Sequence, residues 1–351
     1  MDTILFLAHT EADGSLCRAA LESLGAARAL AAALPDSRLI AGLVGADVRT
    51  AADGIAGCGA ARFLGVSGAP FAQSRYCTDV EAAAAIGRAS GATLVIAPAT
   101  SRWNRALAGA AHRLGGRIDA HATAISAADG SPAVTRWYYR QRLEAVVCRR
   151  IRPWFILLDP GCAQPWAGLP GTATIEPVDA SPAAASRTTV IGVRSPSADL
   201  QTIRPDAKLL FVAGAGWTKT QPDGNAHGRE AEELILDFLR STQASLGSTK
   251  SLVDLTGEGQ PVLGFMTHMN QVGQTGSTPR HAKGLATCCH GEEPHTVGWR
   301  FVTERRAVNL NPNCGWAQGK ADVLYVADAF AVMREVNALL HARLEAPKPA
   351  S

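Results

Sequence analysis

The residues best suited to chemistry lie in one short stretch, Gln271–Gly276, which is Gln-Val-Gly-Gln-Thr-Gly. Glycine permits positive φ and a close backbone approach to a ligand, and successive N–H groups in such a loop point at an anion such as a phosphate. The side chains of Gln274 and Thr275 add donors for a polar ring edge. We interpret the stretch as a loop that wraps a nucleotide-like cofactor, with a polar turn between two elements as the plainer alternative.

The same stretch resembles the FAD-binding signature of the electron-transfer flavoprotein alpha subunit, and four further segments follow that family in order. Leu246–Asp254 resembles Gly-Ala-Ser-Arg-Ala-Ala-Val-Asp, His295 falls at a flavin-facing histidine, Val308–Asn311 resembles Val-Ala-Ile-Asn, and Val326–Asp328 resembles the Val-Ala-Asp that opens the last helix. The chain is thereby identified as a divergent member of this family, corresponding to its large, FAD-binding subunit.

The resemblance implies a cofactor-binding set in the C-terminal half of the chain. Its members are Thr249, Lys250, Gln271, Val272, Gly273, Gln274, Thr275, Gly276, His290, Gly291, His295, Asn311 and Asp328. By family position, Lys250 and His295 place positive charge beside the flavin, and the Thr275 hydroxyl is the donor to flavin N5. Asn311 and Asp328 match contacts to the adenosine half of FAD, although a helix cap is the alternative for Asp328. Because the redox chemistry belongs to the cofactor, we expect an electron carrier and not an enzyme with its own substrate, and we expect no catalytic residue.

Four departures from the family pattern stand out. The family has Gly-Gly-Arg-Gly where this chain has Gly214-Ala-Gly-Trp217, so an arginine is missing and Trp217 could stack on a ring instead. Lys250 replaces an arginine, which keeps the charge and loses the planar fork. The loop over residues 257–270 is longer, and Cys288–His295 replaces a Gly-Ile-Ser-Gly-Ala-Ile-Gln-His cradle, keeping only Gly291 and His295. These changes suggest a specialised branch with its own electron donor.

Two other classes of protein stay open. If the altered contacts abolish the flavin site, the chain is a non-redox nucleotide-binding or scaffold homologue. An enzyme with Cys288 or Cys289 as nucleophile needs a low-pKa thiol beside a base, for which His290 and His295 are the local candidates. A metal or iron–sulfur set of these four residues with Cys314 is disfavoured because the spacing matches neither a zinc knuckle nor a ferredoxin run, and we expect no metal.

The N-terminal half alternates short apolar runs with helical stretches, which is typical of a parallel sheet covered on both faces. The predicted strands include Thr3–Ala8, Arg38–Val44 and Thr93–Ala97; the β-rich segments Thr135–Arg140, Leu143–Cys148 and Trp154–Leu158 predict a meander added to that sheet. Farther on, a strand over Ala207–Ala213 precedes a Gly-containing loop and a helix over Arg229–Ser241, and a final helix spans Ala329–Leu344.

We therefore predict an α/β protein of two domains. Residues 1–185 form a parallel-sheet, nucleotide-binding-like domain, which the resemblance makes a scaffold and the interface with the beta subunit. Residues 186–345 form a Rossmann-like FAD-binding domain, and residues 346–351 form a flexible tail. Asp159–Ser186, rich in Pro, Gly, Ala and Ser, is expected to be a linker, and Thr188–Val193 is expected to be a strand.

Length and composition set the remaining bounds. The 351 residues suit two domains, 47% of them are hydrophobic, and the net charge of +3 comes without a basic stripe, so no nucleic-acid partner is expected. Eight scattered cysteines and a start without a signal-peptide pattern favour a reducing, cytoplasmic compartment. No apolar run is long enough to span a bilayer, so the chain is not expected to be membrane-embedded. The resemblance implies a heterodimer with an electron-transfer flavoprotein beta subunit, a flavin dehydrogenase as donor, and a respiratory-chain quinone reductase or another carrier as acceptor.

Overall fold

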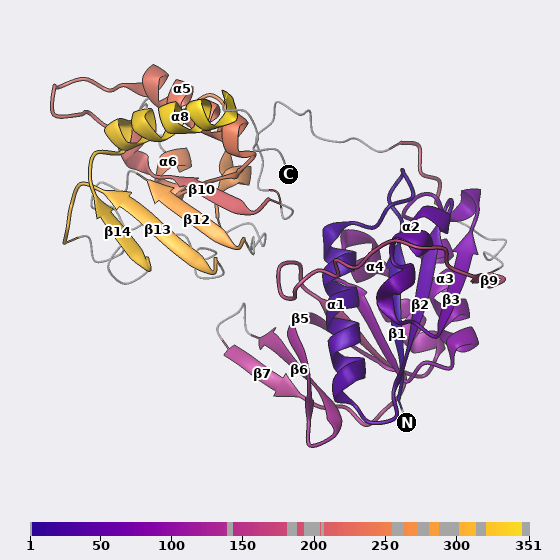
Figure 1. The fold of residues 1–351 in the computed structure, drawn as a ribbon. Helices are drawn as coiled ribbons and strands as arrows, with labels where there is room; N and C mark the ends of the chain where they lie inside the picture. Colours follow the sequence, from indigo (N-terminus) through magenta and orange to yellow (C-terminus); the bar gives the residue numbers. More distant parts are fainter. Residues whose placement is uncertain are drawn as a thin grey trace. The chain divides into compact units, whose positions relative to one another are not determined.

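A computed structural model describes residues 2–138, 143–180, 188–192, 204, 207–254, 263–272, 281–287, 302–313 and 321–345. The chain divides into two compact units, Met1–Arg194 and Ser195–Ser351, each built on its own sheet (Figure 1). The boundary predicted at residues 185/186 and the tail 346–351 lie outside the described residues. The expected α/β class is confirmed, with one mixed and one all-parallel sheet.

The N-terminal unit alternates strands and helices through its first half and then adds strands. In chain order its elements are β1 (Thr3–His9), α1 (Arg18–Ala33), β2 (Arg38–Gly45), α2 (Arg49–Gly54), β3 (Arg62–Ser67), α3 (Tyr76–Ser90), β4 (Leu94–Pro98), α4 (Ser101–Arg113), β5 (Arg117–Ala128), β6 (Ser131–Tyr138), β7 (Leu143–Val147), β8 (Trp154–Leu158) and β9 (Ile175–Pro177). The central strands are uninterrupted apolar runs, as expected of parallel strands covered on both faces.

The nine-stranded sheet has the order β7-β6-β5-β8-β4-β1-β2-β3-β9. All neighbouring pairs are parallel except β5 with β6 and β6 with β7, which are antiparallel. The chain runs outward from β1 through β2 to β3 and then returns to β4 on the other side of β1. This reversal is a topological switch point of the kind at which open α/β sheets bind ligands.

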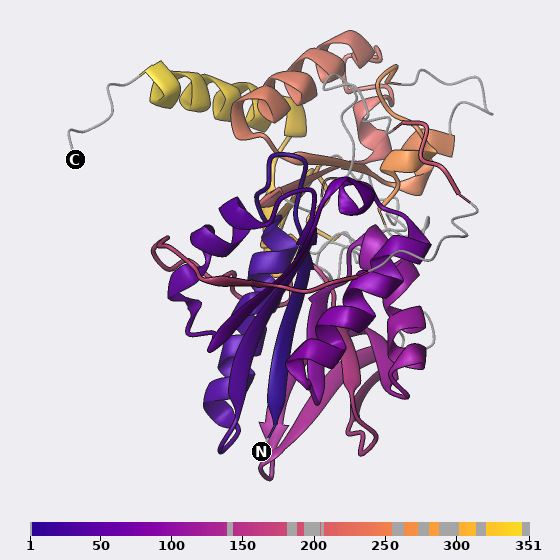
Figure 2. The same cartoon turned by 90° about the vertical axis from the view of Figure 1, so that its right-hand side faces the viewer.

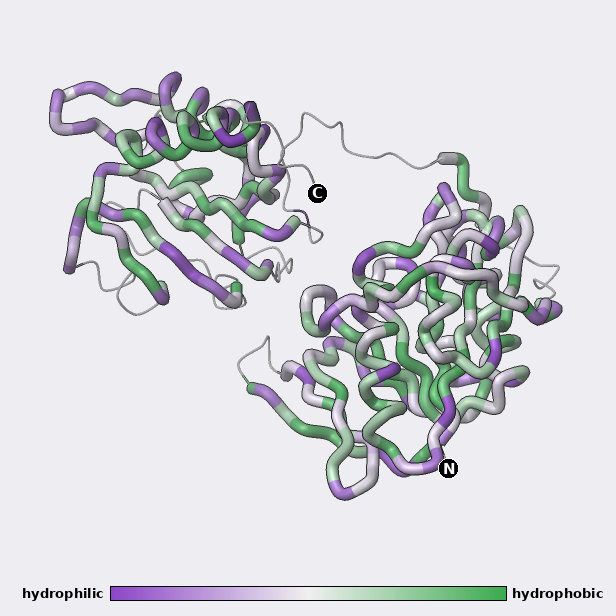
Figure 3. Tube along the Cα trace, in the orientation of Figure 1, coloured by the Kyte–Doolittle hydropathy of each residue, from purple (hydrophilic) through white to green (hydrophobic). Residues whose placement is uncertain are grey.

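Apolar side chains on the two faces of this sheet build two separate cores. One core gathers Phe6, Leu24, Leu43 and Ile96 with α1 and α2, and the other gathers Leu7, Val95 and Trp103 with α3 and α4. Figure 2 shows these helices flanking the sheet, and the central strands are mostly apolar in Figure 3. The unit is therefore a three-layer sandwich.

Three sequence-based expectations for this unit are wrong in detail. Trp154–Leu158 was expected in the meander, yet β8 is a fully buried parallel strand between β4 and β5; the meander is β5-β6-β7. The segment expected as a linker contributes β9 and the buried Trp166 and Ala173, because it crosses α1 and α2 and ends on the edge of β3. Residues 188–192, part of a predicted strand, have no regular structure.

The C-terminal unit repeats the open parallel design on a smaller scale. Its described elements are β10 (Leu209–Ala213), α5 (Gly228–Thr242), β11 (Ser245–Ser248), α6 (Lys250–Asp254), β12 (Lys283–Thr287), β13 (Glu304–Asn309), β14 (Val323–Val326) and α8 (Ala329–Glu345). The sheet order is β11-β10-β12-β13-β14, with every neighbouring pair parallel. The predicted strand, helix and final helix are confirmed at β10, α5 and α8.

Helices α5 and α8 pack together over one face of this sheet (Figure 1). Their apolar stripes meet Phe211 and Leu246, and Asn337 Nδ2 of α8 donates to the Leu234 carbonyl of α5 at 3.0 Å. Arg334 and Glu230 pair between the same two helices. The packing holds the carboxyl ends of the strands in fixed register.

Candidate functional site

The C-terminal sheet has its switch point between β10 and β12, since the chain steps from β10 to β11 on one side and then to β12 on the other. Ligands of open parallel sheets bind at the carboxyl ends of the strands beside such a point. Here β10 ends at Ala213, β11 at Ser248 and β12 at Thr287. The predicted cofactor residues Thr249 and Lys250 follow β11 directly, so the topology places them at this edge.

Two buried polar atoms at the end of β11 lack hydrogen-bond partners in the described structure. They are Ser248 Oγ and Gln271 Nε2. The two residues lie side by side in an isolated parallel bridge, where Val272 N donates to Ser248 O at 3.1 Å. Ser248 is fully buried and Gln271 is 4% exposed. A buried donor without a partner costs about 1–3 kcal/mol, so this edge offers two donors suited to ligand oxygens.

The other described residues of the Gln271 and Thr249 segments have structural partners. Thr249 N donates to Ala213 O at 3.0 Å, and Thr249 Oγ1 accepts from Leu252 N at 3.3 Å, which caps α6. Val272 is completely buried and packs with Leu210 and Val212 beneath the sheet. Lys250, by contrast, is exposed at the start of α6. The Val272 side chain therefore anchors the start of the Gln271–Gly276 segment in the core.

Asn311 and Asp328 lie after the next two strands of the sheet, β13 and β14. Asn311 Oδ1 accepts from Asn313 N at 2.9 Å, and Asn311 N donates to Asn309 Oδ1 at 3.1 Å, so this turn is fixed by its own amides. Asp328 Oδ1 accepts from Ala331 N at 2.8 Å. Asp328 is thus a cap of α8, the alternative named for it; contact with a cofactor stays a prediction.

The remaining predicted site residues lie outside the described part of the chain. They are Gly273, Gln274, Thr275, Gly276, His290, Gly291 and His295, together with the cysteines considered as nucleophile or metal ligands, Cys288, Cys289 and Cys314. Among the described residues, no group of three or more His, Cys, Asp or Glu side chains could hold a metal ion.

Trp217 does not face a ligand, contrary to the suggestion that it could stack on a ring. Its side chain is completely buried, lies against the Phe330 ring with centroids 4.6 Å apart, and donates from Nε1 to Thr287 Oγ1 at 2.9 Å. Its ring therefore ties the loop after β10 to the end of β12. Sequence reasoning missed both Thr287 and Ser248; their position at strand ends is the signal that could have found them.

The switch point of the N-terminal sheet, between β1 and β4, is filled by side chains of the chain itself. His9 Nε2 hydrogen bonds to Thr100 Oγ1 at 3.0 Å, and the His9 ring lies edge-on to Trp103 at 5.6 Å. Burial, reinforced by the charge of Arg102, lowers the pKa of His9 to about 4, so this ring is neutral at pH 7.

Taken together, the two sheets define a protein of two open α/β units, of which the second has polar donors at the carboxyl end of β11, beside its switch point. Residues 4–186 match the electron transfer flavoprotein domain family. Because this match covers more than half of the chain, the chain belongs to the electron transfer flavoprotein domain family. The match lies on the N-terminal unit and leaves the subunit unresolved. A search of curated proteins found no matching relative.

Proposed function

We propose that this chain is the FAD-binding alpha subunit of a heterodimeric electron-transfer flavoprotein. Membership of the family supports the electron-carrier class. The single observation that supports FAD in the C-terminal unit is the pair of unpartnered donors, Ser248 Oγ and Gln271 Nε2, at the carboxyl end of β11. They stand where the FAD signature begins and at the ligand-binding edge of a parallel sheet.

The residues present fit this cofactor in their chemistry. Ser248 and Gln271 supply hydroxyl and amide hydrogens that phosphate or flavin carbonyl oxygens accept. Lys250, exposed at the start of α6, supplies a positive charge next to them. Bound FAD supplies the electron-transfer chemistry itself. The chain's part is to hold the cofactor at the strand ends and to set its charge environment.

The partner is the electron-transfer flavoprotein beta subunit, and the sheet edge at β7 is the proposed contact. β7 is the last strand of the nine-stranded order and pairs with β6 alone among the described strands. It exposes Leu143 at 56% and Val146 at 70%. An unprotected apolar edge strand is a template for pairing with another chain, which supports a subunit at this edge. A flavin dehydrogenase and a quinone reductase or other carrier complete the proposed pathway of electrons.

The first test is an absorption spectrum of the chain co-expressed with the beta subunit. Visible flavin bands that persist through gel filtration and respond to a chemical reductant are the expected result. A folded, colourless heterodimer that takes up no added FAD would contradict the cofactor and favour the non-redox scaffold homologue, which the altered residues Gly214–Trp217 and Cys288–His295 keep open.

A separate test addresses the partner surface. Val146→Lys places a charge on the exposed edge of β7, and we expect it to weaken association with the beta subunit, measured by analytical ultracentrifugation. Leu169→Lys, at a side chain 84% exposed away from this edge, is the control. Equal affinity of both variants for the beta subunit would remove β7 from the interface.

No helix in the described part of the chain is long and apolar enough to cross a membrane. Delivery of electrons to a membrane quinone reductase would then occur by docking of the carrier. We propose the cytoplasm as the compartment, on the cysteine usage alone.

A further inference from the structure

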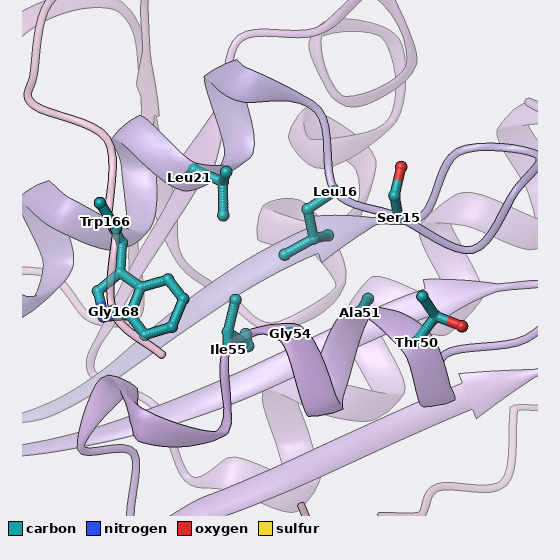
Figure 4. Close-up of a pocket in the computed structure, with 10 residues that line it drawn as sticks. Ser15, Leu16, Leu21, Thr50, Ala51, Gly54, Ile55, Trp166 and Gly168 are labelled. Atoms are coloured by element: carbon teal, nitrogen blue, oxygen red, sulfur yellow. The ribbon is translucent and has the colours of Figure 1, made fainter. Parts of the chain in front are cut away.

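A cavity of about 370 Å³ lies in the N-terminal unit, on the face of the sheet covered by α1 and α2 (Figure 4). Its middle is apolar, with the side chains of Leu16 and Leu21 on one side and Ile55 on the other. The Trp166 ring stands at one end, and Ser15 and Thr50 stand at the opposite end. The volume falls within the range of roughly 300–1,000 Å³ that is typical of small-molecule sites.

The wall that carries Trp166 is fastened to both helices. On α1, Glu22 Oε2 accepts from Gly161 N at 2.6 Å, and Trp166 N donates to Leu21 O at 2.9 Å. On α2, Asp53 accepts from Gly171 N and from Ala173 N, both at 2.9 Å. The segment over residues 161–173, called the strap below, therefore cannot easily collapse onto α1 and α2. A rigid cavity with an apolar middle gains most from an apolar occupant, since water there finds few partners.

The polar end of the cavity, at Ser15 and Thr50, lies beside an exposed loop that carries carboxylates outside the lining. Asp13 Oδ1 accepts from both Ser15 N, at 2.9 Å, and Ser15 Oγ, at 2.7 Å, which fixes the carboxylate beside Ser15. Glu11 lies in the same loop and Asp47 precedes α2. The nearby cations already have partners: Arg18 pairs with Glu22, and Arg49 bonds the Ala173 carbonyl of the strap at 2.6 Å. A cationic head group complements this end, and a carboxylate does not.

We propose that this cavity binds a small amphiphilic amine, with its hydrocarbon body between Leu16, Ile55 and Trp166 and its ammonium group at the Asp13–Ser15 end. The apolar middle selects an alkyl or aralkyl body, and the fixed carboxylate selects the charge of the head. The site is separate from the FAD site proposed in the C-terminal unit, so it holds or fails independently of that function.

The test compares three probes of equal chain length, octylamine, octanol and octanoate, by calorimetry and saturation-transfer NMR on the full chain at pH 7. We expect saturable binding of octylamine at one site, weaker binding of octanol and none of octanoate. Equal binding of octylamine and octanoate, or no saturable binding of octylamine, overturns the proposal.

Two variants locate the site. Leu16→Trp fills the cavity and should abolish octylamine binding, while Leu169→Trp, on the strap with its side chain in solvent, should not.

Asp13→Asn should weaken octylamine binding about two- to fivefold, which is the scale of an exposed ion pair, and leave octanol binding unchanged. Asp129→Asn, in the exposed turn between β5 and β6, is its control. Unchanged octylamine affinity in a folded Leu16→Trp variant, or in Asp13→Asn, contradicts the assignment. Because Asp13 is exposed, its variant tests the proposal even if Leu16→Trp fails to fold.

Discussion

The mixed N-terminal sheet and the parallel C-terminal sheet differ in what occupies the switch point. At the N-terminal switch point, the ring of His9 bonds Thr100 and packs against Trp103, so the crevice between β1 and β4 is filled from within. At the carboxyl end of β11, beside the C-terminal switch point, Ser248 Oγ and Gln271 Nε2 have no hydrogen-bond partner among the described residues. The N-terminal crevice is not fully satisfied either, because Trp103 Nε1 has no hydrogen-bond partner among the described residues.

The comparison indicates that strand order shows where a ligand could bind. Unsatisfied buried donors show where a bound ligand would stabilise the protein by accepting hydrogen bonds. The N-terminal unit also pairs a buried charge: Asp119 is bonded by Arg136, Arg149 and Trp154 Nε1, although Arg136 Nε has no partner among the described residues. A buried carboxylate satisfied in this way stabilises the fold without a ligand. Incomplete polar groups cost stability until a ligand satisfies them.

The largest expected effect tests the Asp119 cluster of the N-terminal unit. Asp119 is fully buried, and although burial raises its pKa, the hydrogen bonds from Arg149, Trp154 and Arg136 outweigh burial and lower the pKa overall. Asp119→Asn would leave two arginines without their counter-charge and should lower the free energy of unfolding by about 3–5 kcal/mol. Denaturant titration followed by circular dichroism measures this loss.

The control for Asp119→Asn is Asp129→Asn, which makes the same chemical change at an exposed turn and should cost little. FAD affinity should be equal in both variants, because the cluster belongs to the N-terminal unit. A loss below 1 kcal/mol for Asp119→Asn would show that this cluster does not stabilise the unit.

The next effect tests the filled switch point through its pH dependence. The pKa of His9 is about 4 in the folded chain, compared with 6.5 for an unperturbed histidine. Between these values the unfolded chain holds a proton that the folded chain rejects, so the stability contributed by His9 is complete above pH 6.5 and is lost as the pH falls toward 4. The loss is on the order of 3 kcal/mol.

His9→Gln should flatten this acid limb in unfolding titrations measured from pH 7 to pH 4. His112→Gln, at an exposed position near the end of α4, should leave the limb in place. An identical pH profile for wild type and His9→Gln would mean that His9 titrates alike in both states, and that the crevice is open to water.

A smaller effect tests the open switch point in the C-terminal unit. Ser248→Ala removes a buried hydroxyl that has no hydrogen-bond partner among the described residues, so the free energy of unfolding of the FAD-free chain should not fall. Loss of a hydrogen bond to FAD should weaken FAD binding by about 0.5–1.5 kcal/mol, or roughly two- to tenfold. Fluorescence titration with FAD measures the affinity.

Ser245→Ala, at the other end of the same strand, is the matched control. Ser245 Oγ accepts from Arg204 N at 2.6 Å, so its removal should cost about 1 kcal/mol of stability and leave FAD affinity unchanged. The comparison between the sheets breaks if Ser248→Ala destabilises the FAD-free chain while FAD binding is unaltered.

The smallest effect concerns the charge beside the proposed flavin. Lys250→Met should lower the reduction potential, because a cation stabilises the added negative charge of the reduced flavin. For a solvent-exposed charge we expect about 10–40 mV, measured by spectroelectrochemical titration. Lys283→Met, at the amino end of β12 and therefore at the opposite edge of the sheet, should leave the potential unchanged. An unshifted potential with FAD still bound would remove this role from Lys250.

Much of the fold could be predicted because the strands are strongly patterned. Thr3–Ala8 and Thr93–Ala97 are uninterrupted apolar runs, and only a parallel strand covered on both faces buries every residue of such a run. β5 escaped prediction because its polar and apolar residues mix over a mostly half-exposed surface. β9 escaped because three residues show no periodicity; its place depends on pairing with β3, more than 100 residues earlier.

The cofactor site at Gln271–Gly276 stays a prediction, made from the composition of this segment and its resemblance to the family signature. The partners of individual atoms around it could not be predicted. Whether Trp217 faces a ligand or Thr287, and whether Ser248 has a partner, depends on strand register between residues far apart in the chain, which no local pattern encodes.

The positions of the strap and β9 late in the sequence determine when the N-terminal unit can finish folding during synthesis. Arg62 of β3 donates to Glu176 of β9, and Asp53 of α2 accepts from Gly171 N and Ala173 N. These bonds can form only after the later residues have been synthesised. While the ribosome is still adding these residues, one edge of the sheet and one wall of the cavity are missing. The sheet edge and the cavity wall of the N-terminal unit can therefore form only after residues up to Pro177 have left the ribosome. A fragment that ends before Ile175 should lack that sheet edge.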